Sequence, residues 1–223
     1  MKYPNFSEER KLWRKGYRFV IGLDEAGRGP LAGSVIAAAV MINSKLKTQN
    51  SKPQLKVQNL LKEIKDSKKL SPKKREELFK ILINHPQIQW GIGKVSEKVI
   101  DKINILEATK LAMKRAIKNL EKKWRRTVLR YFLILDGSFK ISVNIPQKSI
   151  IRADEKVMSC AAASILAKVT RDRIMKREHK KYPQYGFAQN KGYGTKKHLS
   201  ALQKYGPSVI HRTTFGPVQF YLS

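Results

Sequence analysis

The sequence predicts an α/β fold in which helices cover a β-sheet, and three observations support this. Short apolar runs of strand length alternate with longer segments whose apolar residues recur every three or four positions. The chain has 223 residues, 41% of them hydrophobic, which is enough to bury a substantial core. No internal repeat and no domain-separating linker interrupts it. We therefore expect one main domain over residues 18–223, preceded by an N-terminal extension over residues 1–17.

The first two predicted strands flank a glycine-rich turn. The run FVIGL at residues 19–23 is typical of a short buried strand. The second strand is expected within residues 34–42, where VIAAAVM is too uniformly apolar for an exposed edge. The polar, lysine-rich stretch at residues 43–59 contains Pro53 and is expected to form a long mobile loop.

A helix, a strand and a longer helix are expected next. Ser71 suits the N-cap of the first helix, because Pro72 then occupies the first helical position. Residues 88–95 are the third predicted strand. The longer helix is amphipathic, since its apolar residues recur at three- and four-residue steps: Ile105, Ala108, Ala112, Ala116 and Leu120.

The C-terminal half adds two strands and two helices. A strongly apolar strand at residues 128–135 ends in Asp136-Gly137, and a short strand at 149–151 leads to Asp154. An alanine-rich helix follows, with Met158, Ala162, Ile165 and Val169 on one face. The tail holds one expected helix at residues 196–205, and its apolar end, residues 215–220, can dock on the body or on a partner.

The charge of the chain points to a polyanionic partner. Lys and Arg number 47 against 17 Asp and Glu, a formal net charge of +30. Such an excess suits nucleic acid, because neutralised phosphates release condensed counterions. The alternative is that a lysine-rich genome composition simply produces a solvated basic surface. Because acids are scarce, their positions carry more information than usual.

The remaining composition limits the class of protein. No apolar run approaches the 18 residues of a membrane span, and the N-terminus lacks a signal-peptide core. The single cysteine, Cys160, cannot form an internal disulfide and is expected to be a small buried side chain. We therefore expect a cytoplasmic protein without a membrane partner.

Four acids stand at strand ends or at a helix start. Asp24 and Glu25 follow the first strand, Asp136 follows a later one, and Asp154 precedes the alanine-rich helix. Side chains at the ends of adjacent strands can converge, and converging carboxylates need cations between them. Hard oxygen ligands in an open arrangement suit Mg²⁺ or Mn²⁺. Two such ions about 3.5–4 Å apart can clamp the attacking and leaving oxygens of a phosphoryl displacement.

Each acid also has a structural explanation. Asp24 and Glu25 can form a turn with a salt bridge to Arg28, and Asp136-Gly137 is a common turn dipeptide. Asp154 can be a helix N-cap. The acids together, on a basic background, favour a shared metal site.

Other chemistries find little support. No paired cysteines suggest zinc, no phosphate-binding P-loop is present, and the four histidines show no ligand spacing. Ser159 and Ser164 have no histidine nearby in sequence, so packing roles are expected for both.

Six blocks of sequence, in order, resemble the ribonuclease HII family over about residues 18–218. They are DEAGRGPLAG at 24–33, DSKKLS at 66–71, INILEAT at 103–109, LDG at 135–137, Asp154 with AAASILAKVTRD at 161–172, and KGYGT at 191–195 with His198. The first and fifth blocks are the most specific. Two positions depart from the common pattern: Ala153 replaces a glycine and Asn190 a histidine. Neither is a ligand position, so activity is expected to survive.

The resemblance implies a role for each matching residue. Asp24, Glu25, Asp136 and Asp154 match the catalytic, metal-binding acids of the family. Further residues match substrate-binding positions: Gly27, Arg28 and Gly29 in a loop that recognises the ribonucleotide 2′-hydroxyl and its phosphate, Lys68 and Lys69 at backbone phosphates, and Tyr193, which stacks on the sugar 3′ to the scissile bond.

The resemblance also implies a fold and a reaction. The fold is a ribonuclease H-like mixed sheet flanked by helices, with a C-terminal helical extension. The reaction is two-metal-ion hydrolysis, with Mg²⁺ or Mn²⁺, of the RNA strand of RNA/DNA hybrids. It includes nicking 5′ to ribonucleotides embedded in duplex DNA, leaving 3′-hydroxyl and 5′-phosphate ends. A monomer is expected, and a replication-clamp or polymerase partner stays open.

Two alternatives remain. One is a basic nucleic-acid-binding protein without catalysis, which would not need the four acids. The other is activity like that of the related ribonuclease HIII, restricted to hybrids with several ribonucleotides.

Overall fold

The centre of the molecule is a mixed five-stranded sheet. The computed structural model describes residues 4–42, 64, 70–124 and 130–222. The strands are β1 (Phe19–Ala26), β2 (Val35–Ile42), β3 (Ile88–Val95), β4 (Tyr131–Asp136) and β5 (Gln147–Ile150). Each predicted strand is therefore present, with ends displaced by a few residues. The strand β1 continues three residues further than expected and carries Asp24 and Glu25 within the strand.

The order of the strands brings the ends of β1 and β4 together. The sheet runs β3-β2-β1-β4-β5, with β1 antiparallel to β2 and parallel to β4. Leu23 pairs with Leu135. Asp24 and Asp136 each follow one of these leucines. The two carboxylates therefore come from neighbouring positions near the C-terminal ends of the parallel strands β1 and β4. Strand alternation turns both away from the leucine face of the sheet.

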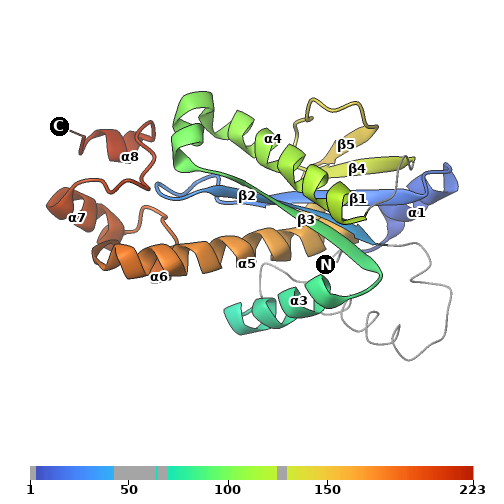
Figure 1. Ribbon diagram of the computed structural model, residues 1–223, viewed down its shortest axis with the longest axis horizontal. Helices are drawn as coiled ribbons and strands as arrows, with labels where there is room; N and C mark the ends of the chain where they lie inside the picture. The colour runs from blue at the N-terminus through green and yellow to red at the C-terminus, as the bar shows by residue number, and fades with distance from the viewer. Residues whose placement is uncertain (1–3, 43–63, 65–69, 125–129, 223) are drawn as a thin grey trace.

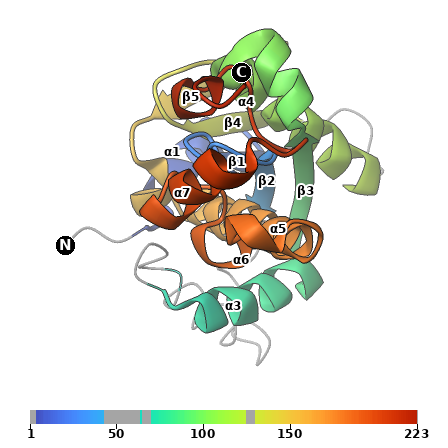
Figure 2. The same cartoon turned by 90° about the vertical axis from the view of Figure 1, so that its left-hand side faces the viewer.

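Helices cover both faces of the sheet, which confirms the predicted layers (Figures 1 and 2). The helix α4 (Glu97–Trp124) covers one face, and α5 (Met158–Lys181) with α3 (Pro72–Asn84) covers the other. The α4 backbone lies very close to β3, since a Cβ on Gly93 would fall 1.9 Å from the Ala112 carbonyl oxygen. Only glycine permits this approach.

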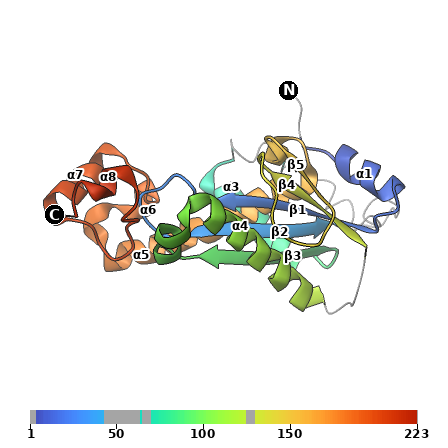
Figure 3. The same ribbon diagram turned by 90° about the horizontal axis from the view of Figure 1, so that it is seen from above.

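The C-terminal elements gather at one end of the sheet, whereas α1 (Ser7–Arg14) lies at the other (Figure 3). They are η4 (Pro183–Tyr185), α6 (Phe187–Asn190), α7 (Lys196–Tyr205) and α8 (Gly216–Gln219). Val218 is fully buried, whereas Phe220 is exposed. The segment at 215–220 thus packs on the body through Val218 and the partly buried Phe215 and leaves Phe220 in solvent.

The helix α1 is joined to the start of α5 by a buried carboxylate. Glu9 Oε1 accepts hydrogen bonds from both the backbone N–H and the hydroxyl of Ser159, each at 2.9 Å. Because Ser159 lies in the first turn of α5, Glu9 satisfies one of the N–H groups that a helix start leaves open. Burial raises the pKa of Glu9. This contact fixes the N-terminal segment against the helix that covers the site.

Local capping rules worked in one place and failed in another. Ser71 is the N-cap of α3, and its hydroxyl accepts from the Lys74 N–H at 3.2 Å, as predicted. The N-cap interpretation of Asp154 is wrong, because Asp154 lies in the 3₁₀ turn η3 (Ala153–Glu155) and Val157 caps α5.

The predicted loop at 43–59 lies outside the described residues. In the described part of the chain, no helix has both the length and the apolar content to cross a bilayer.

Candidate active site

Three carboxylates from separate segments meet where the neighbouring strands β1 and β4 end. One carboxylate oxygen each of Asp24, Asp136 and Asp154 lies within 4.8 Å of the other two. Asp24 and Asp154 are buried, and Asp136 is partly exposed. The sequence predicted this convergence, although Asp154 reaches it from a 3₁₀ turn rather than a helix start.

Backbone hydrogen bonds hold these carboxylates in place. Asp136 Oδ1 accepts from the Ala153 N–H at 2.7 Å, which ties the end of β4 to the turn that carries Asp154. Arg152, just before that turn, has the left-handed φ of 58°. Asp24 Oδ1 accepts from the Glu25 N–H at 2.7 Å. The acids are therefore positioned by backbone that is itself fixed by the sheet.

The electrostatics of the cluster suit a divalent cation. Burial raises the pKa of Asp24 well above its ordinary value, and the charges of Glu25 and Asp136 raise it further. The Ser164 hydroxyl and the Glu25 N–H oppose this rise by hydrogen bonding. Carboxylates this close destabilise one another unless a cation lies between them. Oxygen-only donors with surplus negative charge fit Mg²⁺ or Mn²⁺, so this donor set fits the metal that the sequence predicts.

Glu25 stands beside the three aspartates but outside their group. Its Oε1 pairs with Arg28 Nη1 at 3.2 Å, whereas its buried Oε2 has no hydrogen-bond partner among the described residues. Burial raises the pKa of Glu25 to about 7, against the opposing effect of Arg28. The salt bridge considered from sequence alone thus exists, and it still leaves one carboxylate oxygen available to a ligand.

The loop that follows β1 presents polar groups to solvent. Arg28 and Gly29 are exposed. Within the described residues, neither of their backbone N–H groups has a hydrogen-bond partner. Gly27 has a φ of 99°, which favours glycine strongly. The loop can therefore donate backbone hydrogen bonds to a bound molecule without steric interference from side chains at 27 and 29.

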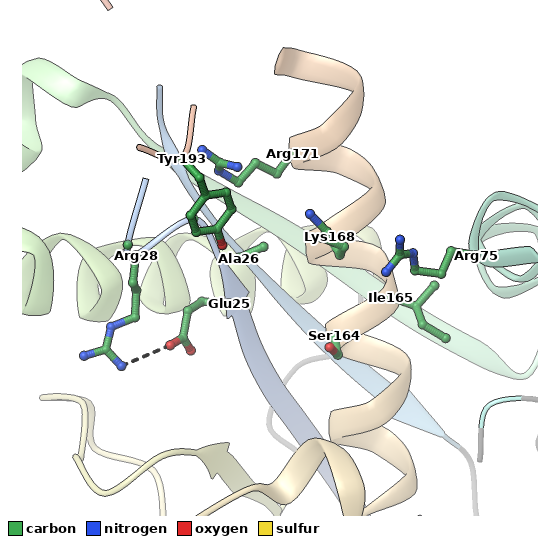
Figure 4. Close-up of a pocket in the computed structure, with 11 residues that line it drawn as sticks. Glu25, Ala26, Arg28, Arg75, Ser164, Ile165, Lys168, Arg171 and Tyr193 are labelled. Carbon is green, nitrogen blue, oxygen red and sulfur yellow. Dashed lines mark hydrogen bonds and ion pairs between the residues drawn. The ribbon is translucent and has the colours of Figure 1, made fainter. Parts of the chain in front are cut away.

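A pocket of about 440 Å³ joins this loop to α5 and to the C-terminal region (Figure 4). Tyr193 and Arg28 lie on one side, and Arg75, Lys168 and Ser164 lie on the other. Tyr193 is 46% exposed, so its ring is available for contact. The pocket lining contains one acid, Glu25, and the cations Arg28, Arg75, Lys168 and Arg171, a predominantly basic combination that fits a phosphodiester. Lys68 and Lys69 lie outside the described residues.

Two buried arginines, which sequence reasoning missed, hold the loop from beneath. Arg212 donates to the carbonyls of Gly27, Arg28 and Gly33 at 2.6–3.0 Å. Arg171 donates to the carbonyls of residues 32 and 34 at 3.2 and 3.3 Å. Among the described residues, no carboxylate pairs with either guanidinium. No sequence pattern marks Arg212, which lies almost 180 positions from the loop it supports.

Replacing Arg212 by lysine is expected to lower both stability and activity. Lysine keeps the charge but has one compact donor group, so several carbonyls lose their partner in a buried place. We expect the free energy of unfolding to fall by about 2–4 kcal/mol. Urea unfolding checks this, with Arg173→Lys as the control. Arg173 is exposed and pairs with Glu76, so its replacement should cost no more than about 1 kcal/mol. Equal losses in both variants would contradict the role of Arg212.

Other expectations are corrected or confirmed. Ser164 does more than pack, because its hydroxyl lowers the pKa of Asp24 and its side chain lines the pocket. Cys160 is fully buried, as expected. Asp172 pairs with Lys168 at 2.8 Å in α5 and is not part of the acid cluster. His198 and His211 are buried and hydrogen-bonded to each other at 3.0 Å.

Comparisons with known proteins agree with this geometry. Residues 21–218 match the family model described as Ribonuclease HII. A ribonuclease HII of Desulfitobacterium hafniense is 48% identical over 95% of this chain and 74% of its own length. The ribonuclease HII of Caldicellulosiruptor bescii is 47% identical over 94% of this chain and 92% of its own. The crystal structure of ribonuclease H2 from Pyrococcus horikoshii superposes with a TM-score of 0.67 and 26% identity, covering 91% of this chain and 96% of that one.

Proposed function

Because this chain belongs to the ribonuclease HII family, whose members are metal-dependent ribonucleases acting on RNA/DNA, we propose that it nicks 5′ to ribonucleotides embedded in duplex DNA. It also cleaves the RNA strand of hybrids. The products carry 3′-hydroxyl and 5′-phosphate ends. The observation that carries this proposal is the three-aspartate cluster beside an exposed Gly-Arg-Gly loop and an exposed tyrosine. Family membership rejects a purely binding role.

Asp24, Asp136 and Asp154 hold the metal in this proposal, and Glu25 supplies a further oxygen through Oε2. Bound Mg²⁺ or Mn²⁺, in a pair when substrate is present, would supply charge neutralisation and an activated water for in-line displacement at phosphorus. The role of the carboxylates would be to hold these ions in place. No side chain in the pocket is assigned as general base, and a substrate phosphate oxygen or solvent accepts the proton.

The Gly-Arg-Gly loop recognises the ribonucleotide. The N–H groups of Arg28 and Gly29 donate to the 2′-hydroxyl and the adjacent phosphate oxygens, which every ribonucleotide offers regardless of base. Arg28 is anchored by Glu25 on one side and lies 5.8 Å from the Phe139 ring centroid. Its guanidinium is therefore held at the pocket edge. This arrangement supports recognition of sugar and phosphate without reading of sequence.

Tyr193 distinguishes the next sugar. Its exposed ring can pack on a deoxyribose, and a 2′-hydroxyl there would crowd the ring. The Cε1 atom of Tyr193 lies 3.7 Å from the point that a Cβ on Gly29 would occupy. The ring and the loop thus form two walls of one narrow space. This supports a preference for an RNA-to-DNA junction.

We propose that the protein acts as a cytoplasmic monomer.

Incubation with duplex DNA that contains one ribonucleotide tests the proposal. Three reactions are compared, with Mg²⁺, with Mn²⁺ and with EDTA. We expect a single nick 5′ to the ribonucleotide in either metal and none in EDTA. Cleavage that survives EDTA would contradict the metal assignment. Cleavage of hybrids without nicking at the single ribonucleotide would favour the ribonuclease HIII-like alternative.

Replacing Tyr193 by alanine is expected to reduce single-ribonucleotide nicking by about 10–100-fold, because stacking on the sugar is lost. Cleavage of long hybrids should fall less, since every position there is a ribonucleotide. The melting temperature should change little, as the ring is half exposed. Steady-state rates on both substrates check this. Tyr205→Ala is the matched control, because Tyr205 is 52% exposed and lies outside the pocket.

A further inference from the structure

The ring of Tyr193 is held by its backbone and not by its hydroxyl. Among the described residues, the hydroxyl has no hydrogen-bond partner. The preceding turn is tight, with left-handed Lys191 and Gly192 at φ values of 53° and 83°. The Tyr193 carbonyl accepts from the Thr195 N–H at 2.8 Å and contacts His198 Nδ1 at 2.9 Å. The direction of the ring therefore depends on what holds this carbonyl.

A chain of two histidines continues from that carbonyl. His198 Nε2 lies 3.0 Å from His211 Nε2. His211 Nδ1 accepts from the Ser208 N–H at 2.8 Å. A carbonyl can only accept, so His198 must carry its proton on Nδ1. Its Nε2 is then the acceptor for the proton on His211 Nε2. Every donor meets an acceptor with both rings neutral, and only this pair of tautomers achieves it.

The surroundings of the pair favour the neutral forms. Both rings are buried and lie edge-on or tilted against Tyr185 and Phe187. Burial lowers the pKa of His198 and of His211, the latter to about 4. Lys197 and Arg212 directly adjoin the two histidines in sequence. Lys197 is exposed, and the Arg212 guanidinium is engaged by the loop carbonyls. A third proton on His198 Nε2 would face the proton on His211 Nε2. On His211 Nδ1 it would face the Ser208 N–H, and the Ser208 hydroxyl and carbonyl oxygens, 2.9 and 3.3 Å away, would have to accept it.

His211 links Tyr193 to the opposite wall of the pocket. It forms an isolated β-bridge with Ala32, and the next residue, Arg212, binds the carbonyls of Gly27 and Arg28. The Leu31 N–H donates to the Gly192 carbonyl at 2.8 Å. The histidine chain thus starts at one wall, Tyr193, and ends in the segment that fixes the other. The width between the two walls depends on it.

We infer that His198 and His211 are positioning residues that set Tyr193 against the Gly-Arg-Gly loop and so determine the preference for a single ribonucleotide. This inference rests on the proposed function, in which Tyr193 and that loop read adjacent sugars. The histidines act through Tyr193 and touch no substrate themselves. If the Tyr193 ring rotated freely, the protein would still cleave hybrids, because every position of the RNA strand in a hybrid is a ribonucleotide.

Two pairs of variants test the inference. His198→Leu removes the donor to the Tyr193 carbonyl, whereas His198→Asn retains an N–H near the Nδ1 position. His211→Leu and His211→Gln are the corresponding pair for the second ring. The readout is the ratio of kcat/KM on single-ribonucleotide duplex to kcat/KM on hybrid. We expect this ratio to fall about tenfold in each leucine variant and to recover to within about threefold in its polar partner.

A double-mutant cycle separates positioning from general damage. In a Tyr193→Ala background, His198→Leu should change the ratio by less than about twofold, because the histidine acts through that ring. If the effects of the two substitutions on this ratio multiply, the inference is overturned. It is also overturned if His198→Leu lowers kcat/KM equally on both substrates. If Tyr193→Ala itself leaves the ratio unchanged, the assigned role of Tyr193 fails. If Tyr193→Ala shifts the ratio and neither leucine variant does, only the histidine inference fails.

The wild-type protein offers a test that does not depend on folding of variants. Nitrogen-15 NMR of the histidine rings distinguishes protonated from unprotonated nitrogens. We expect the proton on Nδ1 of His198 and on Nε2 of His211, with both rings neutral at pH 7. A proton on Nε2 of His198 in place of Nδ1 would overturn the chain, because the imidazole would then donate nothing to the Tyr193 carbonyl.

Discussion

Replacing Asp24 or Asp136 by asparagine is expected to abolish cleavage while nucleic-acid binding persists. Each substitution removes a charged oxygen from the three-aspartate cluster, and with it the neutralisation of transition-state charge by bound metal. A loss of several kcal/mol corresponds to about a thousandfold or more in rate. The basic surface is untouched, so binding to a hybrid should change little. Single-turnover cleavage and a gel-shift assay measure the two effects.

The Asp24→Asn substitution, although it abolishes cleavage, should stabilise the metal-free protein. Asp24 has a raised pKa when folded, so the folded state holds a proton that the unfolded state releases. Stability therefore falls as pH rises from about 4 towards that raised pKa. Asp24→Asn removes this slope and should stabilise the metal-free protein at pH 7. Mg²⁺ should raise the melting temperature of the wild type more than that of the variant.

Asp172→Asn is the matched control for these measurements. Asp172 pairs with Lys168 on α5 and lies outside the acid cluster. Its replacement should change the cleavage rate by less than about threefold and should leave the effect of Mg²⁺ intact. Turnover near the wild-type rate in Asp24→Asn would refute the catalytic assignment. A lost response to Mg²⁺ in Asp172→Asn would place a ligand outside the cluster.

Replacing Gly27 by alanine is expected to lower both stability and activity strongly, because the added methyl group collides with a side chain that supports the loop. The new Cβ would lie 2.1 Å from Arg171 Nε and 3.0 Å from the Ser34 carbonyl oxygen. Arg171 is fully buried and bound to two loop carbonyls, so it cannot move aside without breaking them. The φ of 99° adds strain for any L side chain. The loop must therefore shift.

We expect Gly27→Ala to lower the free energy of unfolding by about 3–5 kcal/mol and cleavage of both substrates by about 100-fold or more. Gly16→Ala is the matched control, because Gly16 has a similar φ of 83° but no atom within 4 Å of its built Cβ. It should show the backbone cost alone, about 1–2 kcal/mol, with unchanged activity. The difference between the two variants in free energy of unfolding should therefore report the collision with Arg171. Identical behaviour would mean that the loop tolerates the methyl group.

Local rules in the sequence predicted most of the fold and the acids. The apolar runs predicted β1, β2 and β4 to within a few residues, because buried strands need continuous apolar side chains. Ser71-Pro72 predicted the start of α3, because a cap depends only on neighbouring residues. Asp24 and Asp136 were predicted to converge, because both follow strands that a sheet can place side by side.

Contacts between distant segments were outside the reach of those rules. The sequence predicts only packing for Ser164, because nothing nearby in sequence shows that its hydroxyl influences the pKa of Asp24 on another element. Asp154 was read as a possible cap, whereas the left-handed Arg152 begins a separate 3₁₀ turn. No local pattern marks the N-terminal Glu9, which binds the start of α5, because its partner is 150 residues away.

The sequence alone determined the elements, the basic character and the acids whose spacing matches a known family. These depend on periodicity, composition and short motifs, which can be read along the chain. Only the tertiary structure decided how the recognition loop is held, because Arg171, Arg212 and the His198–His211 pair come from segments that meet it after folding. Buried carbonyls and imidazoles need partners wherever the fold supplies them, and no local pattern reveals which residue that will be.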